Sequence, residues 1–489
     1  MTDGLVLAID QGTTNTKALA VDAYGRIVAQ ASTPMQVAYP RPGWAEQSAD
    51  DIWTGVRQVI DEVVGAIAAP IAAIAISNQR ETIVLWDAET GRPIGPAIIW
   101  QCRRSAARCA ALRDAGHAAE IIDRTGLDLD PLFPAAKIAW LLDEIPGARA
   151  MTEVGTLRAG TVDAWLLWSL TGGAVHATDH SNASRTQLFN TRTLQWDARL
   201  CDLFDVPVGI LPPVRPSDTR FGETAAVSRL PAGIPIHAMM GDSHAALFGH
   251  GVRQPGTVKA TYGTGSSLMS LTAERVTSTH GLSGTIAWST GTAIAYALEG
   301  NISVSGQSAA FMAEMLGLAD ASALADLAAT VPDSNGVAFV PALVGLGAPH
   351  WRDDARGTIT GLSLGTRPAH LARAALEAIA FQVADVLQAM EEDVGAPMAQ
   401  LRADGGASRN AMLMQFQADV MDRPVVVSEA PEVSALGAAA MAWQALGETM
   451  PPVSAATRFA PQMADTDRQS HRARWRAAIG QALNTTQKD

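Results

Sequence analysis

The feature that most constrains the fold is a unit of two strands joined by a glycine- and threonine-rich turn, which occurs twice. In the first copy, two apolar runs, Leu5 to Ile9 and Ala18 to Val21, flank the polar turn Asp10 to Thr16. About 250 residues later, Val258 to Tyr262 and Leu268 to Leu271 flank a second Gly/Thr/Ser turn. This spacing suggests an internal duplication, although Gly-Thr pairs also arise by chance in a chain with 42 glycines.

The rest of the chain alternates between strand and helix patterns. A helix is predicted from Ala49 to Gly65 and a strand from Ile71 to Ile76. The second half carries alanine-rich helical runs, among them Pro368 to Asp393 and Met412 to Met421. Because 489 residues exceed what a single hydrophobic core usually holds, we predict an α/β protein with at least two domains.

Charge and hydropathy exclude several classes of partner. The chain has 36 Lys and Arg against 49 Asp and Glu, a net charge of -13, which is the wrong sign for broad binding to nucleic acid or anionic lipid. The most apolar stretch, residues 63–76, contains Pro70 and is too short to span a membrane. Three cysteines without a C-x-x-C pair and an N-terminus without an apolar leader favour a reducing compartment. We expect a cytoplasmic protein with no nucleic-acid partner and no membrane insertion.

Several nucleotide and metal motifs are missing from the sequence. The chain has only four lysines and none follows a glycine, which excludes a Walker A loop. No G-x-G-x-x-G follows a strand, and no H-E-x-x-H occurs. Rossmann-type and zinc-dependent functions are therefore not predicted.

The first turn contains the parts of a phosphate-binding site. Gly12 lets the backbone turn so that successive amide groups can face an anion, and Lys17 adds a donor. Asp10 could hold a hydrated Mg²⁺. The alternative is a solvated hairpin turn. The second turn, around Thr264, could supply a facing phosphate site, with an ordinary hairpin loop as its alternative.

Other polar residues have both a chemical and a structural interpretation. Asp242 follows an apolar run and precedes a helix, where its carboxylate could accept a proton from a hydroxyl or cap the helix. Arg80 and Glu81 could together bind vicinal hydroxyls or form a surface ion pair. Gly406 lies between a strand and a helix, where a flat base could approach the backbone, or in a plain loop. Trp100 is by default a core residue.

Taken in order, four stretches resemble the FGGY carbohydrate kinases, and within that family most closely the glycerol kinases. These stretches are Ile9 to Thr14, Ser77 to Thr82, Ile99 to Arg104 and Gln415 to Asp419. The resemblance extends over essentially the whole chain. It implies two ribonuclease-H-like (actin-like ATPase) domains, residues 1–242 and 243–489, around a nucleotide cleft, and it makes the duplication expected.

The resemblance also implies an activity. We expect an ATP-dependent kinase that uses Mg²⁺ and phosphorylates a terminal hydroxyl of a small polyol or sugar, either glycerol or a four- to five-carbon polyol or ketose. A homodimer or a homotetramer is compatible with the family. The alternative is a non-catalytic actin-like ATPase or a sugar-sensing protein. The polar residues Arg80, Glu81 and Asp242 favour the kinase, because a plain ATPase needs no polar substrate site.

Roles for individual residues follow from the same resemblance. Asp242 would be the general base, and Asp10 would organise the metal through water. The nucleotide phosphates would be held by Thr13, Thr14, Asn15, Lys17 and Thr264. The nucleoside side would be contacted by Gly306, Ala310, Gly406 and Asn410. The substrate would be contacted by Arg80, Glu81, Trp100, Leu132, Ser243 and Ser267.

The sequence departs from the glycerol kinases around the substrate. Leu132 stands where they have a tyrosine, Ser243 where they have a glutamine, and Ser267 where they have a phenylalanine. On the nucleotide side Ala310 replaces a glutamine, and Lys17 stands where the family often has arginine. Losing a phenol, an amide and an aromatic wall should widen the pocket and remove hydrogen bonds that discriminate between substrates. We therefore predict a substrate longer than glycerol, with four or five carbons.

Overall fold

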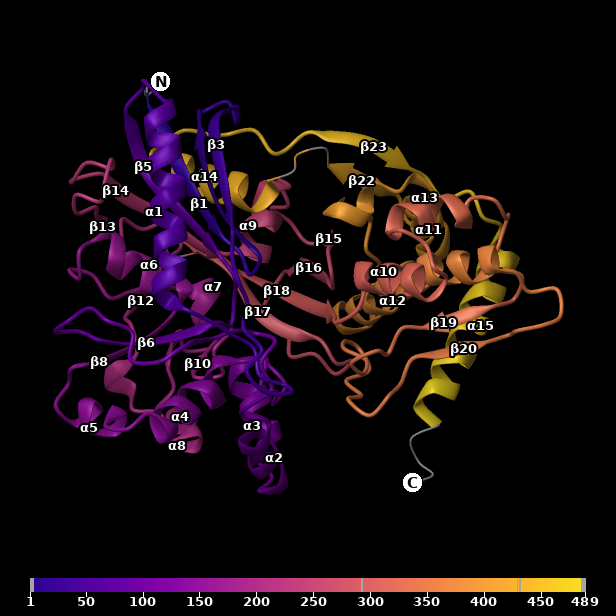
Figure 1. Cartoon of the computed structure of the whole chain (residues 1–489), viewed down its shortest axis with the longest axis horizontal. Helices are drawn as coiled ribbons and strands as arrows, with labels where there is room; N and C mark the ends of the chain where they lie inside the picture. The colour runs from indigo at the N-terminus through magenta and orange to yellow at the C-terminus, as the bar shows by residue number, and fades with distance from the viewer. Residues whose placement is uncertain (1–3, 292, 429, 431, 485–489) are drawn as a thin grey trace.

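The structure is a computed structural model that describes residues 4–291, 293–428, 430 and 432–484. It contains two large mixed sheets, one from each half of the chain (Figure 1). The first sheet has the strand order β13-β14-β5-β1-β2-β3, and the second has the order β17-β18-β16-β15-β21-β22-β23. The α/β class expected from the sequence is thus confirmed.

The strands have the following bounds. The first sheet comprises β1 (Leu5–Gln11), β2 (Asn15–Val21), β3 (Ile27–Pro34), β5 (Ile71–Asn78), β13 (Gly222–Glu223) and β14 (Pro235–Gly241). The second comprises β15 (Thr257–Tyr262), β16 (Ser266–Thr272), β17 (Ser283–Thr290), β18 (Ala293–Ile302), β21 (Gln400–Asp404), β22 (Val425–Ser428) and β23 (Ala455–Phe459). A four-stranded sheet comprises β4 (Glu46–Gln47), β6 (Ile83–Asp87), β7 (Ala97–Ile98) and β8 (Leu157–Thr161). Short ladders pair β9 (Thr178–Asp179) with β12 (Val214–Arg215), β10 (Phe189–Asn190) with β11 (Gln195–Trp196), and β19 (Ala338–Val340) with β20 (Thr358–Thr360).

The helices of the first half are α1 (Ala49–Ala66), α2 (Ala106–Asp114), α3 (Ala118–Thr125), α4 (Pro134–Glu144), α5 (Ala148–Glu153), α6 (Val162–Leu170), α7 (His180–Ala183), α8 (Ala198–Phe204) and α9 (Asp242–Gly249). Those of the second half are α10 (Gly306–Met315), α11 (Ala321–Ala328), α12 (Pro368–Val394), α13 (Ala411–Met421), α14 (Val433–Ala445) and α15 (Asp465–Asn484). Two 3₁₀ turns are η1 (Val208–Ile210) and η2 (Gly406–Arg409). No described helix has the length and apolar composition of a transmembrane segment.

The two large sheets repeat one topology. In the first, β1 pairs antiparallel with β2 and parallel with β5, and in the second, β15 pairs antiparallel with β16 and parallel with β21. Each unit continues with an antiparallel strand, β3 or β18, and with a parallel strand, β14 or β22. The predicted duplication is therefore confirmed as the two-domain, ribonuclease-H-like arrangement of actin-like ATPases. One detail of the prediction was wrong: β1 continues to Gln11 and β2 begins at Asn15, so the first turn spans only residues 12–14.

Alternation along β1 explains how the first sheet buries both of its faces. Leu5, Leu7 and Ile9 pack into a core with residues of α1 and α6, whereas Val6 and Ala8 pack into a core with residues of α9 and α14. Side chains alternate across a strand with period two, so an unbroken apolar run supplies both cores. The sheet is thereby held between two layers of helices.

The helices α9 and α14 lie between the two sheets. Their shared core also includes Met269, Leu271 and Trp288 from strands of the second sheet. Figure 1 shows α14 among the indigo strands of the first half, although it belongs to the last part of the chain. A Cβ atom placed on Gly437 of α14 would lie 1.7 Å from the carbonyl oxygen of Ala245 in α9. The two helices therefore touch backbone to backbone.

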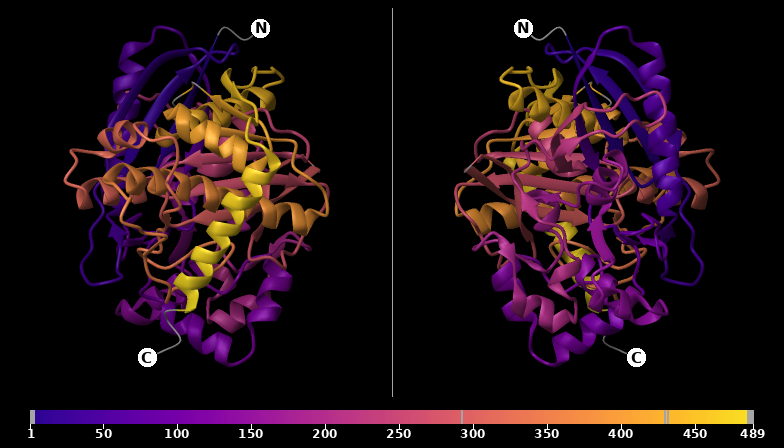
Figure 2. Two further views of the ribbon diagram at one scale, coloured as in Figure 1. Left: turned by 90° about the vertical axis from the view of Figure 1, so that its right-hand side faces the viewer. Right: turned by 90° about the vertical axis from the view of Figure 1, so that its left-hand side faces the viewer.

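Two further parts complete the molecule. A smaller lobe packs the four-stranded sheet against α4 and α8, and its core includes the buried, free cysteines Cys102, Cys109 and Cys201. On the other side, α15 runs along the second half, and the start of β1 and the end of α15 lie at opposite ends of the molecule (Figure 2). The predicted core role of Cys102 and Cys109 is confirmed.

We expect Gly437→Ala to destabilise the protein, because the added methyl group overlaps the backbone of α9. Overpacking of this kind typically costs about 1–3 kcal/mol in the free energy of unfolding. Gly480→Ala is the matched control, since Gly480 is also helical and no atom lies within 4 Å of the added Cβ. Alanine favours a helix, so the control should be neutral or slightly stabilising. Urea titrations followed by circular dichroism measure both variants, and equal loss in both would contradict the helix contact.

Candidate active site

Three parallel strands of the first sheet deliver polar residues to one edge. In the registers of β1, β5 and β14, Asp10 lies opposite Ser77, and Ser77 lies opposite Met240. Asp242 follows directly as the first residue of α9. Ligands of α/β proteins bind at the carboxyl ends of such strands. The topology therefore brings the predicted residues Asp10 and Asp242 to the same edge.

Asp10 is a carboxyl group in an unfavourable position for a negative charge. Burial raises its pKa to about 6, and the nearby carboxylates of Asp242 and Glu432 add to this shift. A hydrogen bond of 2.8 Å from Ser77 Oγ to Asp10 Oδ1 and the charge of Lys17 act in the opposite direction. A bound cation would stabilise the charged form, so the donor set fits a hydrated metal ion.

The first turn is fastened to the substrate side of the predicted site. The indole Nε1 of Trp100 donates to Thr13 Oγ1 at 2.9 Å, and Thr13 Oγ1 donates to Gln79 Oε1 at 3.2 Å. The turn is closed by a bond of 2.9 Å from Gly12 N to Asn15 O. Trp100 is half-buried, and Thr14 and Asn15 are exposed. Trp100 is thus not simply a core residue, because it links the turn to the smaller lobe.

Lys17 meets an acid that the sequence analysis did not identify. Its Nζ lies 2.6 Å from Glu432 Oε2, at the start of α14. The pair connects β2 of the first sheet to a helix of the second half. A phosphate at this turn would compete with Glu432 for the lysine.

The second turn is joined to the start of α10 by three backbone hydrogen bonds. Thr264 O accepts from Ser305 N at 2.9 Å and from Gln307 N at 3.1 Å, while Gly263 O accepts from Gly306 N at 3.0 Å. Thr264 is exposed, and so is Ala310, one helical turn after Gly306. The structure therefore brings the candidate residues Thr264 and Gly306 together and places Ala310 on the same helix as Gly306.

A third loop borders open space at the same edge of the second sheet. Thr261 in β15 lies opposite Asp404 in β21, so the loops that follow these two strands meet at one edge. Gly406 is exposed, and no atom lies within 4 Å of a Cβ placed on it. Asn410 caps α13 by accepting a bond of 3.0 Å from Leu413 N to Oδ1. Gly406 leaves room for a flat group, whereas the Asn410 side chain also has a structural function.

Arg80 and Glu81 belong to a buried network of ion pairs. Arg80 Nε donates to Asp242 Oδ1 at 3.0 Å, and Arg80 Nη1 donates to Glu299 Oε1 at 2.5 Å. Arg185 lies 2.7 Å from Glu299 Oε2 and donates from Nε to Glu81 Oε1, also at 2.7 Å. The side chains of Arg185 and Glu299 are fully buried, and Arg80 is only 8% exposed. The alternative of a surface ion pair is therefore wrong.

The network keeps its charges in spite of burial. Burial acts to raise the pKa of Glu299, but the adjacent Arg185 and Arg80 outweigh it and hold the pKa well below the usual range. Burial likewise acts to lower the pKa of Arg80, and Glu299, Glu81 and Asp242 outweigh it in the other direction. Glu299 comes from β18, so the second half of the chain holds an arginine of the first half in place.

A buried lysine supports two of the predicted substrate residues. Lys137 Nζ donates to the carbonyl oxygens of Glu81 at 2.9 Å and Leu132 at 2.6 Å. Burial lowers the pKa of Lys137 to about 7. Glu81 has a positive φ of 60°, a strained backbone conformation for a residue with a side chain. Lys137 thus fixes both Leu132 and the strained turn at Glu81.

Ser243 and Ser267 form a hydrogen-bonded pair beside the network. Their Oγ atoms lie 2.8 Å apart. Ser243 Oγ accepts from Lys259 Nζ at 3.1 Å, and Ser267 Oγ donates to Glu299 Oε1 at 3.0 Å. The two serines that replace larger side chains therefore lie next to each other, and both connect to buried charges.

Asp242 is exposed enough to meet a ligand. Its side chain is 39% exposed, and its Oδ1 accepts from Arg80 and from the backbone N of Ser243. The N-cap position of α9 is Gly241, so Asp242 is the first helical residue and not the N-cap residue. Its Oδ1 accepts the Ser243 N–H of the first turn, and the same oxygen accepts from Arg80, which orients the carboxylate.

Sequence reasoning missed four buried charged residues: Lys137, Arg185, Lys259 and Glu299. A signal for three of them was present, because Lys137, Lys259 and Glu299 each interrupt an apolar run. Charged residues are almost never fully buried unless they are paired, so such interruptions indicate ionic networks. The chain has only four lysines, and the three described ones all lie in or beside this site.

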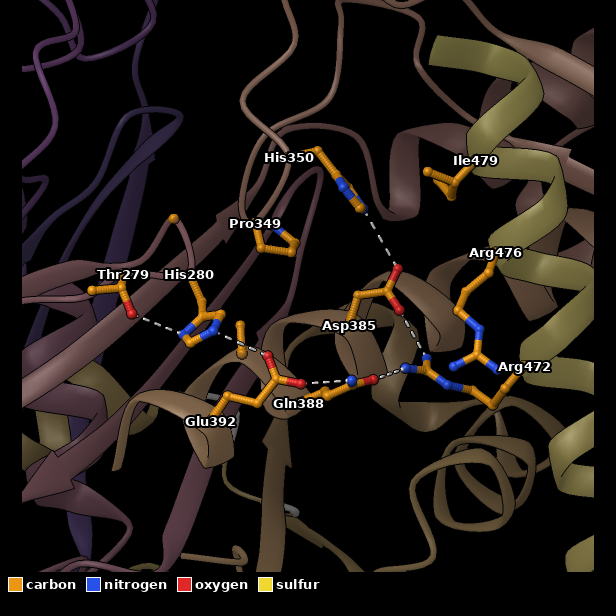
Figure 3. A pocket seen from close by; sticks show the side chains of 12 residues that line it. Thr279, His280, Pro349, His350, Asp385, Gln388, Glu392, Arg472, Arg476 and Ile479 are labelled. Atoms are coloured by element: carbon orange, nitrogen blue, oxygen red, sulfur yellow. Dashed lines mark hydrogen bonds and ion pairs between the residues drawn. The ribbon is translucent and has the colours of Figure 1, made fainter. Parts of the chain in front are cut away.

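A separate hollow of about 430 Å³ lies between α12 and α15 (Figure 3). Asp385 in its wall pairs with Arg472 at 2.9 Å, and Glu392 accepts from Gln388 at 2.8 Å. None of the predicted site residues is among the described residues that line it. Its acidic side chains are occupied by their neighbours, and it lies apart from the edge that carries Asp10 and Asp242.

We expect Arg185→Met to destabilise the protein strongly, because it leaves Glu81 and Glu299 without their shared cation. Breaking a buried ion pair in this way costs about 3–5 kcal/mol. Arg192→Met is the matched control, since Arg192 pairs with Asp123 on the surface and such pairs contribute about 0–1 kcal/mol. Thermal and urea unfolding of the two variants measure the difference. Similar small losses in both would show that the buried network contributes little to stability.

Comparison with known proteins agrees with this geometry. Residues 5–249 match the N-terminal domain of the FGGY family of carbohydrate kinases, and residues 258–446 match its C-terminal domain. The chain is 45% identical to a glycerol kinase of Symbiobacterium thermophilum over 99% of both proteins. It is 49% identical to an apulose kinase of Pectobacterium atrosepticum over 91% of this chain and 90% of that protein.

A solved structure supports the same assignment. The fold matches the crystal structure of Plasmodium falciparum glycerol kinase with ADP, with a TM-score of 0.93, 32% identity and 98% coverage of each chain. These similarities favour an ATP-dependent kinase over a non-catalytic ATPase or a sugar-sensing protein. Motifs, fold and relatives agree, and the chain belongs to the FGGY family of carbohydrate kinases.

Proposed function

We propose that this kinase transfers the γ-phosphoryl group of ATP to a terminal hydroxyl of a polyol or ketose with four or five carbons, in preference to glycerol. The observation that carries the proposal is the pair Ser243 and Ser267, which lies beside Arg80 and Asp242. Two small hydroxyl side chains leave more room and different hydrogen bonds than the larger residues expected there. The similarity to an apulose kinase is compatible with a substrate larger than glycerol.

Asp242 would act as the general base. Its carboxylate would accept the proton of the substrate hydroxyl while the hydroxyl oxygen forms a bond to the γ-phosphorus. The bond between the γ-phosphorus and the bridging oxygen then breaks, and ADP leaves with that oxygen. Phosphoryl transfer depends on positioning and charge stabilisation, and Arg80 contributes by orienting Asp242 at 3.0 Å.

The nucleotide would lie between the two sheets. Thr13, Thr14, Asn15 and Lys17 on one side and Thr264 on the other would hold its phosphates, with Gly306, Ala310, Gly406 and Asn410 beside the nucleoside. Mg²⁺ bound to the phosphates would neutralise their charge, and Asp10 would hold its water ligands. Among the described residues, no group of three or more His, Cys, Asp or Glu side chains could hold a metal ion.

The substrate would lie against the remaining predicted residues. Arg80 and Glu81 would contact its hydroxyls, and the carbon chain would run past Trp100 and Leu132 toward Ser243 and Ser267. The proposed division at residues 242 and 243 assigns Asp242 to one domain and Ser243 to the other. A homodimer or homotetramer is proposed from the family resemblance, and a cytoplasmic location from the free, buried cysteines.

We expect Asp242→Asn to abolish turnover without abolishing nucleotide binding. Loss of a general base should lower kcat by about 10²–10⁴-fold. An amide keeps the size of the side chain, so ADP affinity measured by calorimetry should stay unchanged. Asp50→Asn, an exposed position in the first turn of α1, is the control and should keep full activity. An Asp242→Asn enzyme with normal kcat would exclude Asp242 as the base.

We expect the wild-type enzyme to prefer longer substrates. A coupled assay of ADP release should give a higher kcat/KM for at least one tetritol, tetrulose or pentulose than for glycerol, because the wider pocket binds a longer chain more fully. A panel of three- to six-carbon polyols and ketoses measures this. If glycerol has the highest kcat/KM of the panel, the proposed substrate class is wrong.

A further inference from the structure

A ring of contacts includes the proposed base Asp242 and four other residues, Arg80, Glu299, Ser267 and Ser243. It closes through the backbone between Asp242 and Ser243. Arg80 contacts Asp242 and Glu299, Glu299 accepts from Ser267, and Ser267 bonds to Ser243, which follows Asp242 in the chain. Ser267 is half-buried and the Asp242 side chain is 39% exposed, so a ligand at Asp242 can reach the ring.

The ends of the serine pair determine the direction of its hydrogen bonds. A lysine ammonium group has only donors and a carboxylate has only acceptors, whereas a hydroxyl has one hydrogen. Lys259 Nζ donates to Ser243 Oγ, and Ser267 Oγ donates its hydrogen to Glu299 Oε1. The contact of 2.8 Å between the serines must then use the hydrogen of Ser243.

Both hydroxyl hydrogens of the serine pair are donated to partners within the protein. Each serine oxygen can therefore only accept a hydrogen bond from a ligand. Arg80 has the opposite property, because its N–H groups beyond Nε and Nη1 can only donate. The site therefore has an accepting wall at Ser243 and Ser267 and a donating wall at Arg80. A carbonyl or ether oxygen is matched at Arg80 but meets only lone pairs at the serines.

Resting on the proposed function, we propose that Ser243 and Ser267 form an acceptor-only subsite that binds a hydroxyl hydrogen on the end of the substrate remote from the phosphorylated carbon. Lys259 and Glu299 are positioning residues that set the direction of the chain without contacting the substrate. The subsite selects a polyol or ketose whose far end carries a free hydroxyl. A keto group of such a substrate lies toward Arg80.

Three probes that differ at a single group test this subsite: erythritol, its deoxy analogue without the far hydroxyl, and the fluorodeoxy analogue. Fluorine resembles the hydroxyl in size but cannot donate a hydrogen bond. We expect kcat/KM to fall by roughly 10- to 100-fold for the deoxy analogue, with the fluorodeoxy analogue no better than the deoxy one. A fluorodeoxy analogue that clearly exceeds the deoxy analogue would show that the wall donates, and would overturn the proposal.

Variants separate the subsite from a structural serine pair. Ser267→Ala should bring the erythritol-to-deoxy ratio of kcat/KM close to one, whatever the absolute rates. Ser270→Ala is the matched control, because Ser270 lies on the same strand, is buried and donates to the backbone oxygen of Thr257. The control should keep the wild-type ratio. An unchanged ratio in Ser267→Ala would show that the serines only pack, and would overturn the proposal.

Glu299→Gln tests the positioning residue. Its amide can donate to Ser267 and so release a serine hydrogen toward the ligand, which should raise the fluorodeoxy-to-deoxy ratio above the wild-type value. Glu299→Asp keeps a hydrogen-bond acceptor, so its fluorodeoxy-to-deoxy ratio of kcat/KM should stay at the wild-type value. A general loosening of the site would not raise this ratio in Glu299→Gln alone. If Glu299→Gln fails to fold, the Ser267→Ala ratio still decides. The wild-type measurements distinguish the two proposals. If glycerol has the highest kcat/KM of the substrate panel, the proposed function is wrong. If the three probes have equal kcat/KM, only the subsite is wrong.

Discussion

The rest of the structure depends on the contact between α9 and α14. Each helix follows a parallel strand of one sheet, and the two meet between the sheets with Gly437 against the backbone of Ala245. Because a side chain cannot be inserted there, the distance between the sheets is set by two bare backbones. The first residue of α9 is Asp242, and Glu432, which pairs with Lys17, stands immediately before α14. The same crossing that joins the halves therefore also positions two charged groups at the cleft.

The described lysines of this acidic protein lie close to the candidate active site. With a net charge of -13, the protein has no general attraction for a polyanionic nucleotide, and its three described lysines lie in or beside the site. Lys17 lies next to the first turn, Lys137 donates to the carbonyl oxygens of Glu81 and Leu132, and Lys259 donates to Ser243. Burial lowers the pKa of both Lys137 and Lys259, which shows that these two cations are held where water cannot stabilise them. They act on backbone oxygens and a hydroxyl, and so shape the site instead of attracting its ligands.

Local sequence signals predicted the α/β class and suggested the repeated unit, and the family resemblance supplied the two-domain fold, but neither identified the partners of the site residues. The apolar runs around Gly12 and around Thr264 predicted the repeated unit, because strand alternation and turn chemistry are local properties. Arg80 and Glu81 were identified as candidate residues from the sequence. The sequence did not show whether they are buried or exposed, because their partner Glu299 lies more than 200 residues away in the chain. Whether Asp242 is a cap or a base also depends on such a distant contact. Ion pairs across the cleft join residues that only the tertiary fold brings together. In a single sequence, the only sign of them is a charged residue within an apolar run.

The ion pair between Arg80 and Glu299 would make the proposed substrate recognition depend on how the two halves are arranged. Arg80 comes from the end of the first sheet, while Glu299, Ser267 and Lys259 come from the second. If the halves moved apart, Arg80 would lose the carboxylate that orients it, and the serines would lose the acceptor that gives their chain its direction. The accepting wall and the donating wall thus exist together only when the cleft has this geometry. A substrate that satisfies both walls stabilises that arrangement over an open one by its differential binding. In the proposed function, recognition of the substrate and orientation of Asp242 would therefore both depend on this contact.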